Sequence, residues 1–239
     1  MLRVVYRLRI KCEPRGGKPM NVVDVEKGTV FVLDDSADVR DGLKALAESV
    51  GLRCETFGSS EEFLRHSADG PSCLILDVRL PKTSGLDLQA ELVRGSRNIP
   101  TIIITGHGDI PMTVRAMKAG AVAFLTKPLR EQDVLEAIFA ALERDRLRLA
   151  QEQAANDLQL RFKTLSSRER EILPLITAGL LNKQIASEVG LSEVTVKVHR
   201  SHLMTKLHAK SLPDLVRMAD ALGVRYHPLP KQSVHHSNT

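Results

Sequence analysis

The feature that most constrains the fold of this chain is a short apolar run that ends on an acid. Residues 74–76 are Leu, Ile and Leu, and Asp77 follows them directly. A continuous apolar run is typical of a strand buried on both faces of a parallel sheet. Open α/β sheets bind their ligands at the carboxyl ends of such strands. Asp77 is therefore a candidate site residue, although an acid in this place can also cap a loop or pair with a surface base.

Strand-like and helical patterns alternate on both sides of this run. Gly, Pro or Ser-x-x-acid signals separate the segments. Strands that alternate with helices form parallel sheets, so we expect a doubly wound, flavodoxin-like sheet of five strands. The predicted strands are 30–33, 52–56, a run ending at Asp77, 100–105 and 121–125, and the predicted helices are 38–50, 109–119 and segments beginning at Ser59, Ser84 and Glu131.

The helical pattern that begins near Glu131 continues through a charged run, residues 143–148, to about residue 158. Since neither Gly nor Pro interrupts it, we expect one long helix that joins two domains. A frayed, charged linker is the alternative interpretation.

Four further helical segments follow the long helix. Ser166 and Ser211 each precede an acid by three residues, Ser192 caps another segment, and the segment 182–189 ends at Gly190. A helix, a tight turn that contains Gly and a second helix have the spacing of a helix-turn-helix. We therefore expect an all-α, four-helix domain of this type.

The chain of 239 residues has room for two domains, and their charges differ. Residues 29–143 hold 12 Lys and Arg against 17 Asp and Glu, whereas residues 161–239 hold 12 against 6. The basic part is a candidate for contact with a nucleic-acid backbone, although a solvated surface gives the same count. We expect a flexible tail at 1–28, an α/β domain at 29–143, a helical linker at 144–163, the helix-turn-helix domain at 164–226 and a disordered tail at 227–239.

The composition argues against several classes of protein. Cys12, Cys54 and Cys73 are scattered without a CxxC spacing, so we expect neither a disulfide framework nor a zinc site. The sequence contains no apolar run near the ~18 residues of a membrane span. Arginines interrupt the first 12 residues, which lack the apolar core of a signal peptide. We expect a cytoplasmic protein without membrane contact.

Polar side chains stand at the ends of the predicted strands, namely Asp34 with Asp35, Asp77, Thr105 and Lys127. The carboxyl ends of parallel strands meet at one edge of a sheet, so we expect these side chains to converge. Three carboxylates repel one another unless a cation lies among them, and oxygen ligands without His or Cys favour Mg²⁺. A cation, a hydroxyl and an ammonium around Asp77 suit phosphoryl transfer to a carboxylate.

This set of residues, in this order, resembles the receiver domain of bacterial two-component response regulators over about residues 29–145. The segment 105–112, TGHGDIPM, is similar to the FixJ-type branch of that family. The resemblance implies that Asp77 accepts a phosphoryl group from a sensor histidine kinase. It further implies that Mg²⁺ is the cofactor.

The same resemblance implies roles for the residues around Asp77. Lys127 would contact the phosphoryl group and form a cis peptide bond with Pro128. Thr105 and Phe124 would form a conformational switch, although Phe124 fits an ordinary core position nearly as well. The implied Mg²⁺ ligands are Asp34 (directly or through water), Asp35, Asp77 and the backbone carbonyl of Arg79.

A helical wheel over residues 193–207 places Val196, Leu203 and Leu207 on one stripe, which must face the core. The opposite side carries small, basic and hydroxyl side chains. Such a helix suits entry into the major groove of DNA, and equally an ordinary solvated face.

The segment 165–224 closely resembles the LuxR-type helix-turn-helix, through the motifs LSxRExEIL, NKxIA and SExTVKVHR. The resemblance implies that Lys197, Val198 and Ser201 approach base edges. Leu181 replaces the usual Ser or Thr cap, so Asn182 is a candidate for the cap, in competition with a phosphate contact. The implied phosphate contacts are Asn182, Lys183, Thr195, His199 and Lys206.

Together these features predict a transcription factor controlled by phosphorylation, and not an enzyme. Phosphorylation of Asp77 would create a homodimer surface on the fourth helix and fifth strand, and the dimer would bind double-stranded promoter DNA, with RNA polymerase as a further partner. One alternative is a Mg²⁺-dependent phosphohydrolase with Asp77 as nucleophile. The other is a DNA-binding protein whose receiver domain no longer responds to phosphate.

Overall fold

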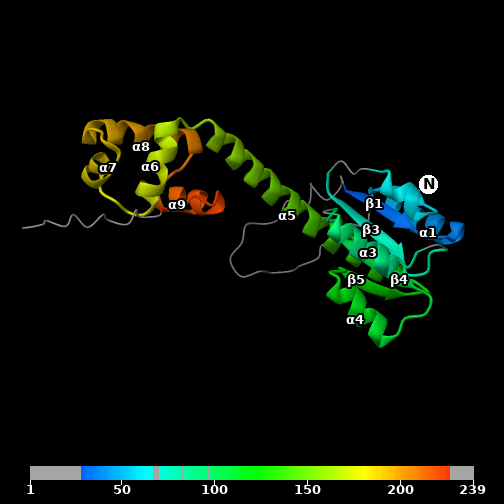
Figure 1. The fold of residues 1–239 in the computed structure, drawn as a ribbon. Helices are drawn as coiled ribbons and strands as arrows, with labels where there is room; N and C mark the ends of the chain where they lie inside the picture. The colour runs from blue at the N-terminus through cyan, green and yellow to red at the C-terminus, as the bar shows by residue number, and fades with distance from the viewer. Residues whose placement is uncertain (1–27, 67–69, 82, 96, 227–239) are drawn as a thin grey trace, which may run out of the picture. The chain divides into compact units, whose positions relative to one another are not determined.

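The chain divides into two units, Met1–Arg146 and Leu147–Thr239. The predicted tails, 1–28 and 227–239, lie outside the described residues except for Gly28. The computed structural model describes residues 28–66, 70–81, 83–95 and 97–226 (Figure 1).

The first unit is built on one sheet in which all neighbouring strands are parallel (Figure 1). Its strands are β1 (Thr29–Leu33), β2 (Arg53–Phe57), β3 (Ser72–Asp77), β4 (Thr101–Thr105) and β5 (Ala123–Thr126). Their order in the sheet is β2-β1-β3-β4-β5, which confirms the predicted five-stranded, doubly wound fold. β1, β3 and β4 are buried along their whole length, as their continuous apolar runs predict.

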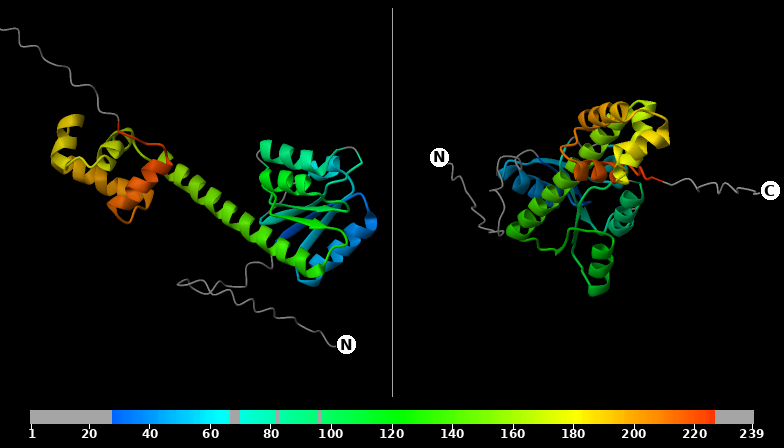
Figure 2. Two further views of the ribbon diagram at one scale, coloured as in Figure 1. Left: turned by 90° about the horizontal axis from the view of Figure 1, so that it is seen from below. Right: turned by 90° about the vertical axis from the view of Figure 1, so that its left-hand side faces the viewer.

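Helices cover both faces of this sheet (Figure 2). They are α1 (Ala37–Ser49), α2 (Ser60–Leu64), α3 (Gly85–Arg94), α4 (Ile110–Lys118) and α5 (Glu131–Lys163). α1 and the first turns of α5 pack on one face, and α2, α3 and α4 pack on the other. Every crossover therefore leaves the carboxyl ends of the strands at one open edge.

The structure shifts several of the predicted bounds, among them the starts of β2 and β5 and the end of the long helix. β2 begins after Leu52, because the N–H of Leu52 donates to the carbonyl of Ala47 at 3.2 Å and closes α1. β5 begins after Ala121 in the same way, since the N–H of Ala121 donates to Ala116 at 3.1 Å and closes α4. The predicted long helix is confirmed, and it ends at Lys163 rather than near residue 158.

Ser84 precedes α3 as predicted, but its side chain accepts no cap hydrogen bond from the residues that the structure describes. Its backbone instead pairs with Arg79 in a short antiparallel bridge. The acid three residues later, Asp87, forms an ion pair with Arg115 of α4 at 2.6 Å. Contacts with neighbouring elements have therefore replaced the local cap.

The second unit is helical, which confirms the predicted fold class. Its helices are α6 (Ser167–Thr177), α7 (Asn182–Val189), α8 (Glu193–Leu207) and α9 (Leu212–Ala221), and the last turns of α5 pack on the same core. The capping box that opens α6 is complete: the Ser166 hydroxyl accepts from the N–H of Glu169 at 3.2 Å, and the Glu169 carboxylate accepts from the N–H of Ser166 at 2.7 Å. Gly190 ends α7 with φ 66°, a conformation that favours glycine.

Candidate functional site

The register of the sheet brings two of the predicted acids together. Leu33 at the end of β1 pairs with Leu76 of β3, so the next residues, Asp34 and Asp77, are neighbours at the carboxyl edge. Both are buried, whereas Asp35 is exposed on the loop that enters α1. Oxygen atoms of the three carboxylates lie within 4.8 Å of one another, an arrangement that could hold a hard divalent cation.

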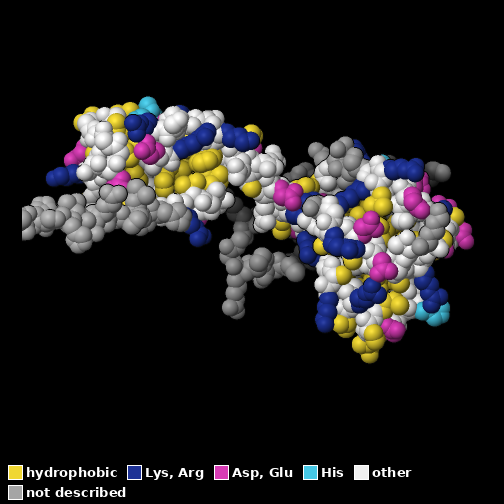
Figure 3. All heavy atoms as spheres, in the orientation of Figure 1, with side chains coloured by type: hydrophobic (Ala, Val, Ile, Leu, Met, Phe, Trp, Pro, Cys, Tyr) yellow, Lys and Arg dark blue, Asp and Glu magenta, His cyan; other side chains and the backbone are white. Residues whose placement is uncertain are grey.

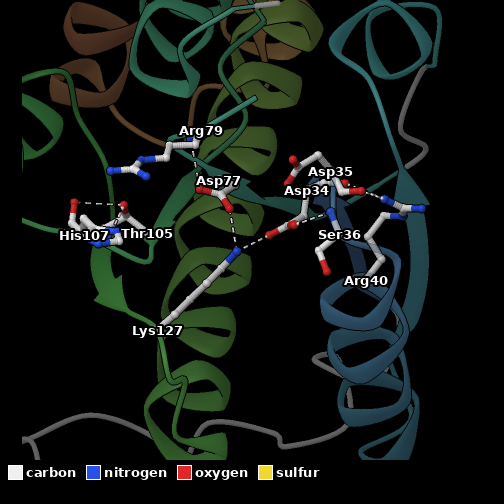
Figure 4. A network of polar contacts seen from close by, with 9 residues as sticks. All are labelled: Asp34, Asp35, Ser36, Arg40, Asp77, Arg79, Thr105, His107 and Lys127. Carbon is white, nitrogen blue, oxygen red and sulfur yellow. Dashed lines mark hydrogen bonds and ion pairs between the residues drawn. The ribbon is translucent and has the colours of Figure 1, made fainter. Parts of the chain in front are cut away.

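Lys127 reaches the same edge from the end of β5 (Figure 4). Its Nζ lies 2.7 Å from a carboxylate oxygen of Asp34 and 2.5 Å from one of Asp77. The peptide bond between Lys127 and Pro128 is cis, as predicted. One ammonium thus compensates two buried carboxylates.

The environment shifts the pKa values of Asp34 and Lys127. Burial raises the pKa of the Asp34 carboxyl, although the hydrogen bonds from Lys127 and from the N–H of Ser36 oppose the shift. Burial acts to lower the pKa of Lys127, but its bonds with Asp34 and Asp77 outweigh burial and raise it. Lys127 therefore keeps its charge at neutral pH, and the buried acids would be stabilised by a further cation.

Asp77 is held in place from two sides. Its carboxylate accepts a hydrogen bond from the N–H of Arg79 at 3.0 Å through the oxygen that Lys127 does not bind. Gly85, the first residue of α3, packs directly against its backbone, and a Cβ at Gly85 would lie 2.1 Å from the carbonyl oxygen of Asp77. Only glycine permits this approach.

Thr105 and Phe124 lie on the neighbouring strands β4 and β5. The buried hydroxyl of Thr105 donates to the carbonyl of His107 at 3.2 Å and accepts from its N–H at 3.3 Å (Figure 4). Phe124 is half-buried and packs against the core on the α2–α4 face of the sheet. Gly108 leaves room for this ring, since a Cβ at Gly108 would lie 2.9 Å from it. The switch role of the two residues stays a prediction.

Two further residues belong to this site although no sequence pattern predicted them, Arg40 and Gly85. Nη1 of Arg40 donates to the backbone carbonyls of Asp34 at 2.7 Å and of Asp35 at 3.0 Å. No local pattern marks an arginine in a surface helix for this contact. A glycine at the first position of a helix is a weak signal that could have singled out Gly85.

The burial pattern of α8 agrees with the helical wheel. Val196, Leu203 and Leu207 are buried in the core of the second unit, as the helical wheel predicts. The opposite side of α8 is exposed and carries two apolar side chains, Val194 and Val198. Of the predicted DNA contacts, Lys183, Lys197, Val198 and Ser201 are exposed, and Asn182, Thr195, His199 and Lys206 are half-buried.

Asn182 does not take over the cap of α7, contrary to the prediction. The N–H of Leu181 donates to the side-chain oxygen of Gln184 at 2.8 Å, which is the contact made at this helix start. The side-chain oxygen of Asn182 instead accepts from Arg200 of α8 at 3.4 Å. The physical reason is position, because Asn182 already lies in the first turn of α7 and points toward α8.

Lys206 and Thr195 already have protein partners. Nζ of Lys206 lies 2.7 Å from the buried carboxylate of Glu169 and donates to the carbonyl of Thr164 at 3.4 Å. The hydroxyl of Thr195 lies 2.8 Å from that of Ser192, the N-cap of α8. Their phosphate contacts stay predictions, and DNA would have to compete with these bonds.

Comparison with known protein families defines the class of protein to which these two units correspond. The family model for the response regulator receiver domain matches residues 30–139, and that for the luxR family of bacterial regulatory proteins matches residues 163–219. A chain that joins these two domains is a two-component response regulator that regulates transcription.

Comparison with individual proteins shows to which branch of the response regulators the chain belongs. Nodulation protein W of Bradyrhizobium diazoefficiens is 53% identical over 199 residues, which cover 83% of this chain and 88% of that protein. Transcriptional regulatory protein FixJ of Rhizobium meliloti is 45% identical over 196 residues, or 82% and 96% of the two chains. The structure of the response regulator StyR matches with a TM-score of 0.74 at 48% identity and covers 81% of this chain and 98% of that one. The chain belongs to the FixJ-type response regulators, as its motifs predict.

Among the helices that the structure describes, none is both long enough and apolar enough to cross a membrane.

Proposed function

We propose that a sensor histidine kinase transfers a phosphoryl group to Asp77 and thereby controls DNA binding by this regulator. The observation that carries the proposal is the position of Lys127 between Asp34 and Asp77 at the carboxyl edge of the sheet. Phosphoryl transfer needs positive charge around the phosphoryl oxygens, and it needs little other chemistry from the protein. Lys127 supplies one positive charge beside Asp77, and the three acids could hold a divalent cation that supplies the rest.

The acids of the site fit Mg²⁺, a cation that receiver domains bind through acidic residues. Asp35, Asp77 and the backbone carbonyl of Arg79 would hold the ion, with Asp34 binding directly or through water. Bound Mg²⁺ supplies positive charge next to the phosphoryl oxygens. Lys127 would supply the second positive charge. A carboxylate oxygen of Asp77 would form the new O–P bond as the P–N bond to the kinase histidine breaks, and the imidazole would leave.

Thr105 and Phe124 would transmit the phosphorylation of Asp77 to the rest of the receiver domain. In the proposal the hydroxyl of Thr105 leaves the backbone of His107 and turns toward the phosphoryl oxygens. The half-buried ring of Phe124 then moves inward into the vacated space. Two discrete arrangements of packed side chains give the domain a two-state response.

The exposed apolar side of α4 supports phosphorylation-dependent homodimerisation. Ile110, Val114 and Met117 are exposed and spaced so that they share one side of the helix, and Ile110 is 80% exposed. Figure 3 shows hydrophobic side chains over α4 at the lower end of the first unit. Burial of this stripe, together with β5, in a dimer would remove apolar area from water.

A dimer would present two copies of α8 to paired half-sites in double-stranded promoter DNA. Lys197, Val198 and Ser201 would read base edges, because they lie on the exposed side of α8. Phosphate contacts from Asn182, Lys183, Thr195, His199 and Lys206 would set the register without reading sequence. RNA polymerase would be the next partner at the promoter.

The substitution Asp77→Asn tests the proposal, because it removes the nucleophile with little change in shape. We expect Mg²⁺-dependent labelling by acetyl phosphate to fall to background, while the matched variant Asp157→Asn, at an exposed acid of α5, keeps it. Labelling of the Asp77 variant at the wild-type level would refute the assignment. Sustained turnover of added phosphate esters would favour the phosphohydrolase instead.

A further inference from the structure

We infer that Arg40 is a positioning residue for Asp34 and Asp35 of the cation site, and that it acts by holding the backbone of the loop that carries these two acids. The inference rests on the proposed function, since it concerns the same site. Arg40 itself would contact neither the phosphoryl group nor the ion.

The geometry of Arg40 is that of a clamp on two successive peptide groups. The residue lies in the first half of α1, and its side chain turns back toward the end of β1 (Figure 4). One nitrogen, Nη1, donates to the carbonyl of Asp34 at 2.7 Å and to that of Asp35 at 3.0 Å. Hydrogen bonds from a charged donor are stronger than those between neutral groups, and a guanidinium stays charged at any physiological pH.

Other contacts hold this loop from different directions. The N–H of Asp34 donates to the carbonyl of Phe57 at the end of β2, at 3.3 Å. The N–H of Ser36 donates to the carboxylate of Asp34 at 2.9 Å. The guanidinium of Arg40 also lies over Gly58, where a Cβ would be 3.7 Å from Nη1. Arg40 therefore spans the loops that follow β1 and β2.

Asp35 depends on this clamp more than the other acids do. Asp34 and Asp77 are buried and bonded to Lys127, whereas Asp35 is exposed and lies beyond the last paired residue of β1. An ordered ligand binds an ion without a further loss of chain entropy. The backbone bond from Arg40 supplies this order to Asp35.

Charge and positioning have opposite effects on cation affinity, which makes the inference testable. A guanidinium near the site repels Mg²⁺, so its removal would strengthen binding if charge were its main effect. Loss of an outer-shell partner instead weakens metal binding by roughly 10–100-fold. The sign of the change in affinity distinguishes the two.

The experiment is calorimetric titration of Mg²⁺ into the full-length, unphosphorylated protein. We expect Arg40→Met to bind Mg²⁺ about tenfold or more weakly. Arg40→Lys should lie between Arg40→Met and wild type, because lysine keeps the charge but its shorter side chain reaches the two carbonyls less well. The control is Arg53→Met, which removes the same charge from an exposed side chain at the opposite end of the sheet. The Mg²⁺ concentration for half-maximal labelling by acetyl phosphate should rise by the same factor, and saturating Mg²⁺ should restore the rate.

Wild-type or tighter Mg²⁺ binding by Arg40→Met would overturn the inference and leave the phosphoacceptor assignment of Asp77 intact. If Arg40→Met does not fold, Arg40→Lys decides, because a pure charge effect leaves its affinity unchanged. A wild-type protein that binds no Mg²⁺ would remove both the cation site and the role of Arg40. Labelling that persists in Asp77→Asn would refute the phosphoacceptor assignment and would not bear on the Mg²⁺ affinity of the Arg40 variants.

Discussion

Among single residues, charge compensation decides what the site can bind. Asp34 is fully buried, and Lys127 is shared between it and Asp77. With Asp35 nearby, three carboxylates face one ammonium within the described cluster. Like charges at such distances repel strongly in a partly buried site. A further positive charge would relieve this repulsion, and the oxygen ligands favour a hard divalent cation as that charge.

The contact between Gly85 and Asp77 yields a prediction for stability. Gly85→Ala would place a Cβ 2.1 Å from the carbonyl oxygen of Asp77, so either α3 or the end of β3 must move. We expect a loss of about 1–3 kcal/mol in unfolding free energy and slower labelling of Asp77. Chemical denaturation and acetyl phosphate labelling measure the two effects.

Gly42→Ala is the matched control for Gly85→Ala. Gly42 lies inside α1, and a Cβ there would meet nothing within 4 Å. Alanine should stabilise that helix by about 0.5–1 kcal/mol. Equal stability changes at the two positions would show that the approach of Gly85 to Asp77 has no energetic consequence.

The residues that could be predicted from sequence are those that a topological rule brings together. Asp34, Asp77 and Lys127 stand at strand ends, and parallel strands end at one edge. Arg40 and Gly85 could not be assigned in this way, because their roles depend on distances across the fold. The helical wheel likewise gave the exposed side of α8 but not the partners of Lys206, which lie on α6 and at the end of α5.

At the scale of the elements, an ion pair links α6 to α8. The buried carboxylate of Glu169 in α6 lies 2.7 Å from Nζ of Lys206 in α8. Burial would raise the pKa of Glu169, but the hydrogen bonds from Lys206 and Ser166 outweigh it and lower the pKa below the ordinary value of 4.5. A group whose pKa is lower in the folded state stabilises the fold above its unfolded pKa. That contribution is lost as the pH falls through the folded pKa.

The substitution Glu169→Gln tests this link. At pH 7 we expect the variant to be less stable by roughly 1.5–3 kcal/mol, since a charged hydrogen bond is lost. The difference from wild type should shrink as the pH falls below 4.5. Hydrogen exchange of the α6 and α8 amides reports on this unit separately. The control Glu193→Gln, at an exposed acid of α8, should show no comparable change, and a pH-independent difference for Glu169→Gln would count against the link.

The existence of each element was easier to predict than its ends. The long helix α5 follows from a stretch without Gly or Pro, and its full length includes turns that pack on the second unit through Leu158 and Phe162. The starts of β2 and β5 were wrong, because Leu52 and Ala121 close the preceding helices through backbone bonds. These hydrogen bonds depend on the folded path of the chain, so the apolar pattern of the sequence does not indicate them.

For the whole molecule, the apolar side of α4 leads to a prediction about assembly. Ile110→Glu places a charge in the proposed dimer surface, and we expect it to weaken phosphorylation-dependent dimerisation at least tenfold, or about 1.4 kcal/mol. Labelling of Asp77 should not change, because Ile110 is exposed. Sedimentation with and without acetyl phosphate measures the effect.

Val93→Glu is the control for the dimer prediction, since Val93 is an exposed apolar residue of α3. It should dimerise like the wild-type protein. If Ile110→Glu also dimerises normally when labelled, another surface forms the dimer. If both variants fail to dimerise, the effect is one of added charge and not of the α4 surface.

Chemical mapping of the phosphorylated residue tests the assignment of Asp77 directly. Borohydride reduces an aspartyl phosphate to homoserine, which mass spectrometry locates after digestion. If Asp77 is the phosphoacceptor, homoserine will be found at position 77 after treatment with acetyl phosphate, and only when Mg²⁺ is present. Homoserine at another acid, or modification of position 77 that is independent of Mg²⁺, would contradict the assignment.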